Sequence, residues 1–66
     1  MEIFAKRIKE LRIECGLTQK QLADELGFPQ SSIVYWEAGT KTPRAETIVA
    51  LARFFGVTTD YLLGED

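Results

Sequence analysis

The chain has 66 residues, of which 45% are hydrophobic and 27% are charged, and its formal net charge at pH 7 is −2. This length leaves room for one domain, which we expect to span residues 1–66, and the composition argues against a disordered chain. No apolar run approaches the roughly 18 residues of a membrane span, and the N-terminal residues do not have the order of a secretory signal peptide. Because Cys15 is the single cysteine, no disulfide forms within the chain, and we expect a cytoplasmic protein.

Glycines divide the sequence into short segments, at positions 16, 27, 39, 56 and 64. A glycine just after the last helical residue adopts the left-handed conformation that ends a helix. In the first segment Phe4, Ile8, Leu11 and Cys15 fall on one helical stripe. This pattern predicts a helix that ends near Gly16, with Cys15 as a small buried side chain at its end.

The second segment opens with Thr18, a good helix N-cap, and Gln21 follows at the spacing of a capping box. Its inward residues are Leu22, Ala23 and Leu26. The third segment predicts a helix from about residue 30 to residue 38, with Ile33 and Trp36 facing inward.

The last two segments are also helical in pattern. The fourth places Ile48, Leu51, Ala52 and Phe55 on one stripe. In the fifth, Thr58 can cap a short helix that contains residues 61–63. The sequence therefore predicts an all-α fold of five helices, without strands or internal repeats.

Residues 18–39 carry the most informative pattern. Three residues, 27–29, separate two short helices and allow only a sharp turn, and Ala23 provides the small side chain that a close helix crossing favours. This is the arrangement of a helix-turn-helix, in which the second helix enters the major groove of DNA. The alternative interpretation is an ordinary tight helical hairpin within a bundle.

The outward face of the third helix is uncharged, and it consists of Gln30, Ser31, Val34 and Tyr35. Solvated helix faces normally carry Glu and Lys. A glutamine can pair with adenine, a serine can bond to either base type, and a valine can contact a thymine methyl group. We therefore expect base contacts here, the alternative being a polar surface or a patch that binds a protein partner.

Residues 19–36 resemble the helix-turn-helix of the Cro and phage-repressor family, the XRE type. The shared features are Thr18-Gln19, Ala23, Leu26-Gly27, Gln30-Ser31-Ser32-Ile33 and Trp36-Glu37-Ala38-Gly39, followed by similar segments at 40–43, 46–48, 55–58 and 60–63. The resemblance implies a compact, lambda-repressor-like domain that binds double-stranded DNA sequence-specifically and regulates transcription. We expect a repressor rather than an activator.

The resemblance also implies roles for single residues. Gln30, Ser31 and Tyr35 match positions that reach base edges, whereas Pro29 and Val34 stand where the family is commonly polar. Gln19 and the backbone around Thr40 and Lys41 match phosphate-binding positions. With the neighbouring polar and basic residues, the expected phosphate contacts are Thr18, Gln19, Lys20, Thr40, Lys41 and Arg44.

Arg12 and Glu37 each flank an inward-facing stripe, four residues after Ile8 and Ile33 respectively. They are either two unrelated charges or a partly buried ion pair between the first and third helices. Matching positions of the family carry such a pair, and we therefore expect one here.

Charge and apolar residues are unevenly distributed. Residues 1–44 contain seven Lys and Arg against six Asp and Glu, whereas residues 45–66 contain one against four. The second part should therefore face away from phosphates, and apolar residues beyond the core stripe lie there, namely Val49, Phe54 and Tyr61. We expect these to form a homodimer interface for a palindromic operator, with dimerisation weak in solution and completed on DNA. A protein-interaction module of the same fold, such as an antitoxin, is the alternative.

Catalysis is not expected. The sequence contains no histidine, and no metal-ligand cluster, glycine-rich phosphate loop or convergent pair of carboxylates occurs in it. We therefore expect neither a metal nor a cofactor.

Overall fold

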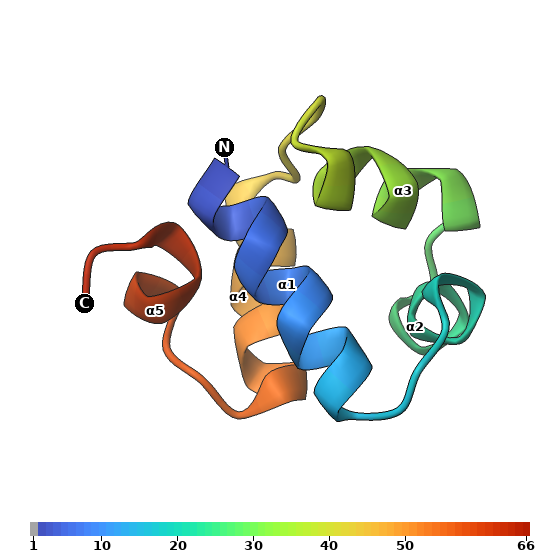
Figure 1. Cartoon of the computed structure of the whole chain (residues 1–66), viewed down its shortest axis with the longest axis horizontal. Coiled ribbons are helices and arrows are strands. Elements are labelled where there is room, and N and C mark those ends of the chain that lie inside the picture. The colour runs from blue at the N-terminus through green and yellow to red at the C-terminus, as the bar shows by residue number, and fades with distance from the viewer. Residues whose placement is uncertain (1) are drawn as a thin grey trace.

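A computed structural model describes residues 2–66 and shows five helices joined by short loops. The helices are α1 (Glu2–Glu14), α2 (Gln19–Leu26), α3 (Gln30–Ala38), α4 (Ala45–Phe55) and α5 (Thr59–Leu63). In Figure 1, α1 crosses the centre in front of α4, α2 and α3 lie on one side, and α5 lies on the other. No strand occurs in residues 2–66, which confirms the all-α prediction.

Local signals determine where the helices begin and end. At the start of α2, the Thr18 hydroxyl accepts a hydrogen bond from the Gln21 amide at 3.0 Å, and the Gln21 side chain accepts one from the Thr18 amide at 2.9 Å. This is the predicted capping box. The Thr58 hydroxyl caps α5 by a single hydrogen bond, which it accepts from the Tyr61 amide at 3.0 Å. Gly27 ends α2 at a φ of 77°, in the left-handed region that favours glycine.

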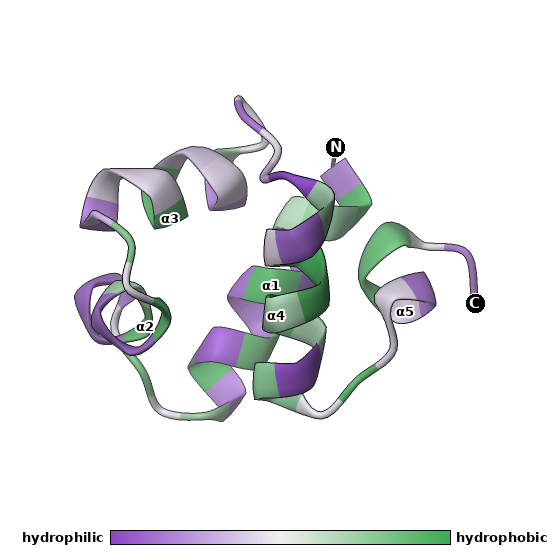
Figure 2. Cartoon of the chain, turned by 180° about the vertical axis from the view of Figure 1, so that it is seen from behind, coloured by the Kyte–Doolittle hydropathy of each residue, from purple (hydrophilic) through white to green (hydrophobic). Residues whose placement is uncertain are grey.

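The core draws at least one buried side chain from each helix, which explains how so short a chain maintains one interior. Its buried members are Phe4, Ile8, Leu22, Ala23, Ile33, Trp36, Leu51, Ala52 and Leu62. Figure 2 shows that hydrophobic segments of α4 alternate with hydrophilic ones, as expected for a helix with one buried face. Within residues 2–66, no helix combines the length and the apolar character needed to cross a membrane.

The prediction that Cys15 is buried was wrong. Helix α1 ends at Glu14, and Cys15 lies in the turn that follows, where it is exposed. Gly16 reverses the chain there with a φ of 71°. The helix therefore ends one residue before Cys15, and the Cys15 side chain does not lie on the apolar face of α1.

Arg7 attaches α5 and the C-terminal residues to α1. Its Nη1 atom donates to the carbonyl of Tyr61 and, at 2.9 Å, to Oδ1 of Asp66, and its guanidinium lies 4.3 Å from the centroid of the Tyr61 ring. The hydrogen bond from Arg7 lowers the pKa of Asp66 below the ordinary value of 3.8. Tyr61, expected at the dimer interface, is consequently half-buried beneath this arginine.

Candidate nucleic-acid interface

The turn between α2 and α3 is held by backbone and aromatic contacts. The Phe28 amide donates to the Ala23 carbonyl at 3.0 Å, and the Phe28 ring packs edge-on against Trp36 with 5.1 Å between ring centroids. Ala23 is only 1% exposed, so its small side chain lies in the interior between the helices. These contacts fix the direction of α3 relative to α2, as a helix-turn-helix requires.

The four residues expected to contact bases all lie on the exposed side of α3, namely Gln30, Ser31, Val34 and Tyr35. Val34 is 41% and Tyr35 43% exposed, whereas Ile33 and Trp36 are buried on the opposite side. Most of the α3 ribbon has near-neutral hydropathy in Figure 2. This face therefore presents hydrogen-bonding groups, an aromatic ring and an apolar group without a charge.

The only charged residue of α3 is Glu37, and it forms the predicted ion pair with Arg12. Arg12 donates from Nε to Oε2 at 2.6 Å and from Nη2 to Oε1 at 3.0 Å, and its Nη1 donates to the Leu17 carbonyl at 2.8 Å. The Glu37 and Arg12 side chains are 4% and 12% exposed. The hydrogen bond to Glu37 raises the pKa of Arg12 above its ordinary range. The pair joins α1 to α3.

Gln19 joins the same network, which the sequence did not indicate. Its Nε2 atom donates to Oε1 of Glu37 at 3.1 Å, so α2 is linked to α1 and α3 at this point. One N–H of the side-chain amide remains for another acceptor. The contact therefore orients Gln19 and leaves it able to donate to a phosphate.

The start of α2 offers further donors. The backbone amides of Gln19 and Lys20 open the helix and have no intrahelical carbonyl partner. The Thr18 hydroxyl accepts from Gln21, and its own hydrogen remains free to donate. Lys20 lies 3.3 Å from Asp24 across one turn, but both side chains are about two-thirds exposed, so this pair is weak. Such a helix end favours a bound anion.

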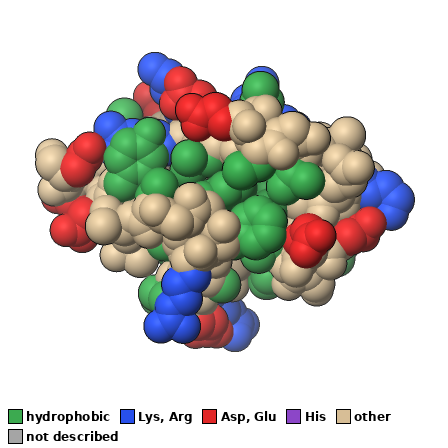
Figure 3. Space-filling model, turned by 90° about the horizontal axis from the view of Figure 1, so that it is seen from below, with side chains coloured by type: hydrophobic (Ala, Val, Ile, Leu, Met, Phe, Trp, Pro, Cys, Tyr) green, Lys and Arg blue, Asp and Glu red, His purple; other side chains and the backbone are tan. Residues whose placement is uncertain are grey.

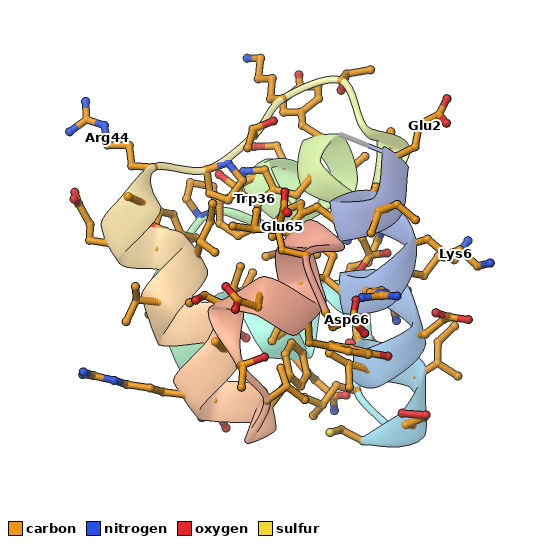
Figure 4. All side chains as sticks on the ribbon, turned by 90° about the vertical axis from the view of Figure 1, so that its left-hand side faces the viewer. Glu2, Lys6, Trp36, Arg44, Glu65 and Asp66 are labelled. Carbon is orange, nitrogen blue, oxygen red and sulfur yellow. The ribbon has the colours of Figure 1, made fainter. Side chains whose placement is uncertain are left out.

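The loop after α3 returns to the helix. The Tyr35 carbonyl accepts hydrogen bonds from the Thr40 amide at 3.1 Å and from the Thr40 hydroxyl at 3.2 Å. The Lys41 ammonium lies 4.4 Å from the centroid of the Tyr35 ring. Arg44 precedes α4, and Figure 4 shows its side chain extending away from the protein. Neither Lys41 nor Arg44 forms an ion pair within residues 2–66.

The residues expected at a dimer interface lie on α4 and α5. Val49 and Phe54 are each 39% exposed, and Val49 borders a shallow apolar groove of about 210 Å³ between these helices. The groove is lined by Ala45, Ile48, Val49, Thr59 and Leu63. Phe54 packs edge-on against Phe55 at the end of α4. Figure 3, which views the side opposite loop 40–43, shows a continuous apolar area between charged side chains.

Comparisons with known proteins agree with this geometry. A family model described as Helix-turn-helix matches residues 8–62. The HTH-type transcriptional regulator ImmR of Bacillus subtilis is 38% identical over 63 residues, which are 96% of this chain and 50% of that protein. The cryptic phage CTXphi transcriptional repressor RstR of Vibrio cholerae is 33% identical over 96% of this chain and 57% of its own length.

A third relative is the HTH-type transcriptional activator BcrR of Enterococcus faecalis, which is 39% identical over 96% of this chain and 31% of its own length. The chain thus spans about half the length of the first two relatives. The family match covers both helices of the motif and the helices that support them. The chain therefore belongs to the helix-turn-helix family of the Cro and phage-repressor type.

Proposed function

We propose that this protein is a sequence-specific double-stranded DNA-binding transcriptional regulator, and that residues 1–66 form a single DNA-binding domain. The observation that carries the proposal is the uncharged, exposed face of α3, bordered by free donors of α2 and by two unpaired cations after α3. Positive charge at the borders holds phosphates, while a neutral polar centre can read base edges. We propose a binding protein and not an enzyme, acting in the cytoplasm.

Base readout comes from α3 in the major groove. Gln30 and Ser31 open the helix, and it is the N-terminal end of the second helix that enters the groove deepest. Gln30 can form two hydrogen bonds with an adenine, and Val34 one methyl contact with a thymine. Tyr35 reaches a base pair further along, near the end of α3.

Phosphate contacts lie on two sides of α3. On one side, Thr18, Gln19 and Lys20 present the hydroxyl, amide and ammonium donors at the start of α2. On the other side, Thr40, Lys41 and Arg44 occupy the loop that leads to α4. With α3 in the major groove, these two groups of donors could each contact the phosphates of one of the two DNA strands that border it. These contacts would set affinity and orientation without reading sequence.

A second copy is the proposed partner at the apolar surface of α4 and α5, which includes Val49, Phe54 and the half-buried Tyr61. The acidic surplus of residues 45–66 keeps this side from phosphates. One short helix reads few base pairs, so two copies on a palindromic operator would supply the missing specificity. We propose that the dimer is completed on DNA and that binding represses transcription, as the name of the Vibrio relative states for that protein.

Selection from a pool of random duplexes tests the proposal. The protein should enrich one palindromic sequence and bind it more tightly than random DNA, with affinity for both falling as salt rises. A salt titration of fluorescence anisotropy on the two duplexes measures this. Enrichment of no sequence, together with salt-independent binding or none, would favour a protein-interaction role instead.

A further inference from the structure

We infer that Lys41 is a positioning residue for base recognition: it holds the ring of Tyr35 in one orientation and so sharpens discrimination at the base pair that Tyr35 meets. This inference rests on the proposed DNA-binding function. It assigns to Lys41 a role in specificity, beyond the phosphate contact that its charge alone would provide.

The contact between the two side chains is direct. The ammonium nitrogen lies 4.4 Å from the ring centroid, well inside the roughly 6 Å range of a cation–π interaction. Tyr35 is 43% exposed, and within residues 2–66 it belongs to neither of the two aromatic pairs. Lys41 also has no carboxylate partner in the part of the chain that the structure describes. Each side chain is thus the other's specific partner.

The backbone places Lys41 where it can make this contact. The Tyr35 carbonyl accepts from the Lys41 amide at 3.4 Å as well as from both donors of Thr40. The backbone of Lys41 is therefore hydrogen-bonded to the same residue, Tyr35, whose ring its side chain covers. Arg44, three residues later, extends away from the protein (Figure 4) and provides a natural comparison.

The size of the effect decides what Lys41 can do. A cation–π contact at an exposed site corresponds to about a two- to fivefold preference for one arrangement. That preference is too small to matter for folding, but it is sufficient to favour one orientation of an exposed ring before DNA arrives. Ordering the ring in advance reduces the entropy lost on binding. Because an ammonium has three donors, Lys41 can lie over the ring and still donate to a phosphate.

A double-mutant cycle separates the two roles. Tyr35→Leu first identifies the base pair at which sequence preference depends on Tyr35. Discrimination is then defined as the ratio of the Kd values for a site altered at that base pair and for the selected site. Lys41→Met should reduce discrimination about two- to fivefold in the wild-type background and leave it unchanged in the Tyr35→Leu background. Lys41→Arg should restore it, and Tyr35→Phe should preserve the dependence on Lys41.

Arg44→Met is the matched control, because it removes a cation from the same loop without touching the ring. It should weaken binding to both sites equally in both backgrounds. An equal loss of discrimination from Lys41→Met in both backgrounds would overturn the inference.

A measurement on the free protein tests the contact without DNA. The ε-methylene protons of Lys41 should be shifted upfield by the Tyr35 ring in the NMR spectrum, and Tyr35→Leu should abolish the shift. Absence of the shift in the wild-type protein would overturn the inference. If the wild-type protein prefers no DNA sequence, the proposed function and this inference both fail. The NMR shift of the Lys41 protons then still shows whether the contact between Lys41 and Tyr35 exists.

Discussion

Arg12 and Glu37 form a bidentate ion pair that is largely shielded from solvent and joins α1 to α3. The two residues are 25 positions apart in the sequence, so the pair links segments that lie on either side of α2 in the chain. Gln19 adds the start of α2 to the same carboxylate. The relative positions of α1, α2 and α3 thus depend on Glu37.

Glu37→Gln should therefore lower the free energy of unfolding by up to about 3–5 kcal/mol, since it leaves the partly buried Arg12 charge without a counter-ion. Urea denaturation measures the change. Asp24→Asn is the control, because it breaks the exposed pair with Lys20 and should cost less than about 1 kcal/mol. Equal small effects of the two substitutions would show that the Arg12–Glu37 pair adds little to stability.

The Arg7–Asp66 contact predicts a pH dependence. Because the pKa of Asp66 is lower in the folded protein than its ordinary value, this contact stabilises the fold above about pH 3.8 and loses its effect as pH falls through the lower folded pKa. A ¹³C NMR titration of the Asp66 carboxyl should give a midpoint below 3.8 in the wild-type protein, rising toward 3.8 in Arg7→Met.

Lys6→Met provides the control for that titration. It removes a positive charge from the same helix, and Figure 4 shows the Lys6 side chain directed away from Asp66. The Asp66 midpoint should remain near that of the wild-type protein. A midpoint equally shifted by both substitutions would indicate a general charge effect and not the Arg7 hydrogen bond.

Arg44→Gln should weaken binding to every DNA sequence alike. Each phosphate contact that is lost reduces the slope of log K against log salt by about 0.9. The measurement is a salt titration of anisotropy with the selected duplex and with a random one. An unchanged slope on both duplexes would place Arg44 outside the proposed interface.

Phe54→Glu should disrupt assembly on DNA by placing a charge in the apolar surface of α4 and α5. Sedimentation with a palindromic duplex should show one protomer bound where the wild-type protein binds two. Ile13→Glu is the control, because it adds the same charge at a 58% exposed hydrophobic side chain of α1. Two protomers per duplex with undiminished cooperativity in Phe54→Glu would contradict the proposed interface.

Much of this fold could be predicted because its signals are local. Thr18 and Thr58 cap helices through residues three positions away, and Gly27 ends α2 through its own φ angle. The outward residues of α3 followed from helical periodicity in the same way. Cys15 was the exception, since periodicity does not say at which residue the helix stops.

Contacts between distant residues could not be found in this way. Arg7 and Asp66 are 59 residues apart, and neither position has a pattern that distinguishes it from other exposed charges. The Arg12–Glu37 pair was expected because both residues flank inward-facing stripes, and the family resemblance supported it. The contact of Gln19 with Glu37 and that of Lys41 with Tyr35 depend on side-chain directions that spacing does not determine.

Gln30→Ala tests whether the exposed face of α3 reads base sequence. Binding of the wild-type protein and the variant should be measured at one salt concentration, on the selected duplex and on a random one. We expect the variant to lose about 1–3 kcal/mol on the selected duplex and almost nothing on random DNA. Equal losses on both duplexes, or none on either, would contradict base readout by this face.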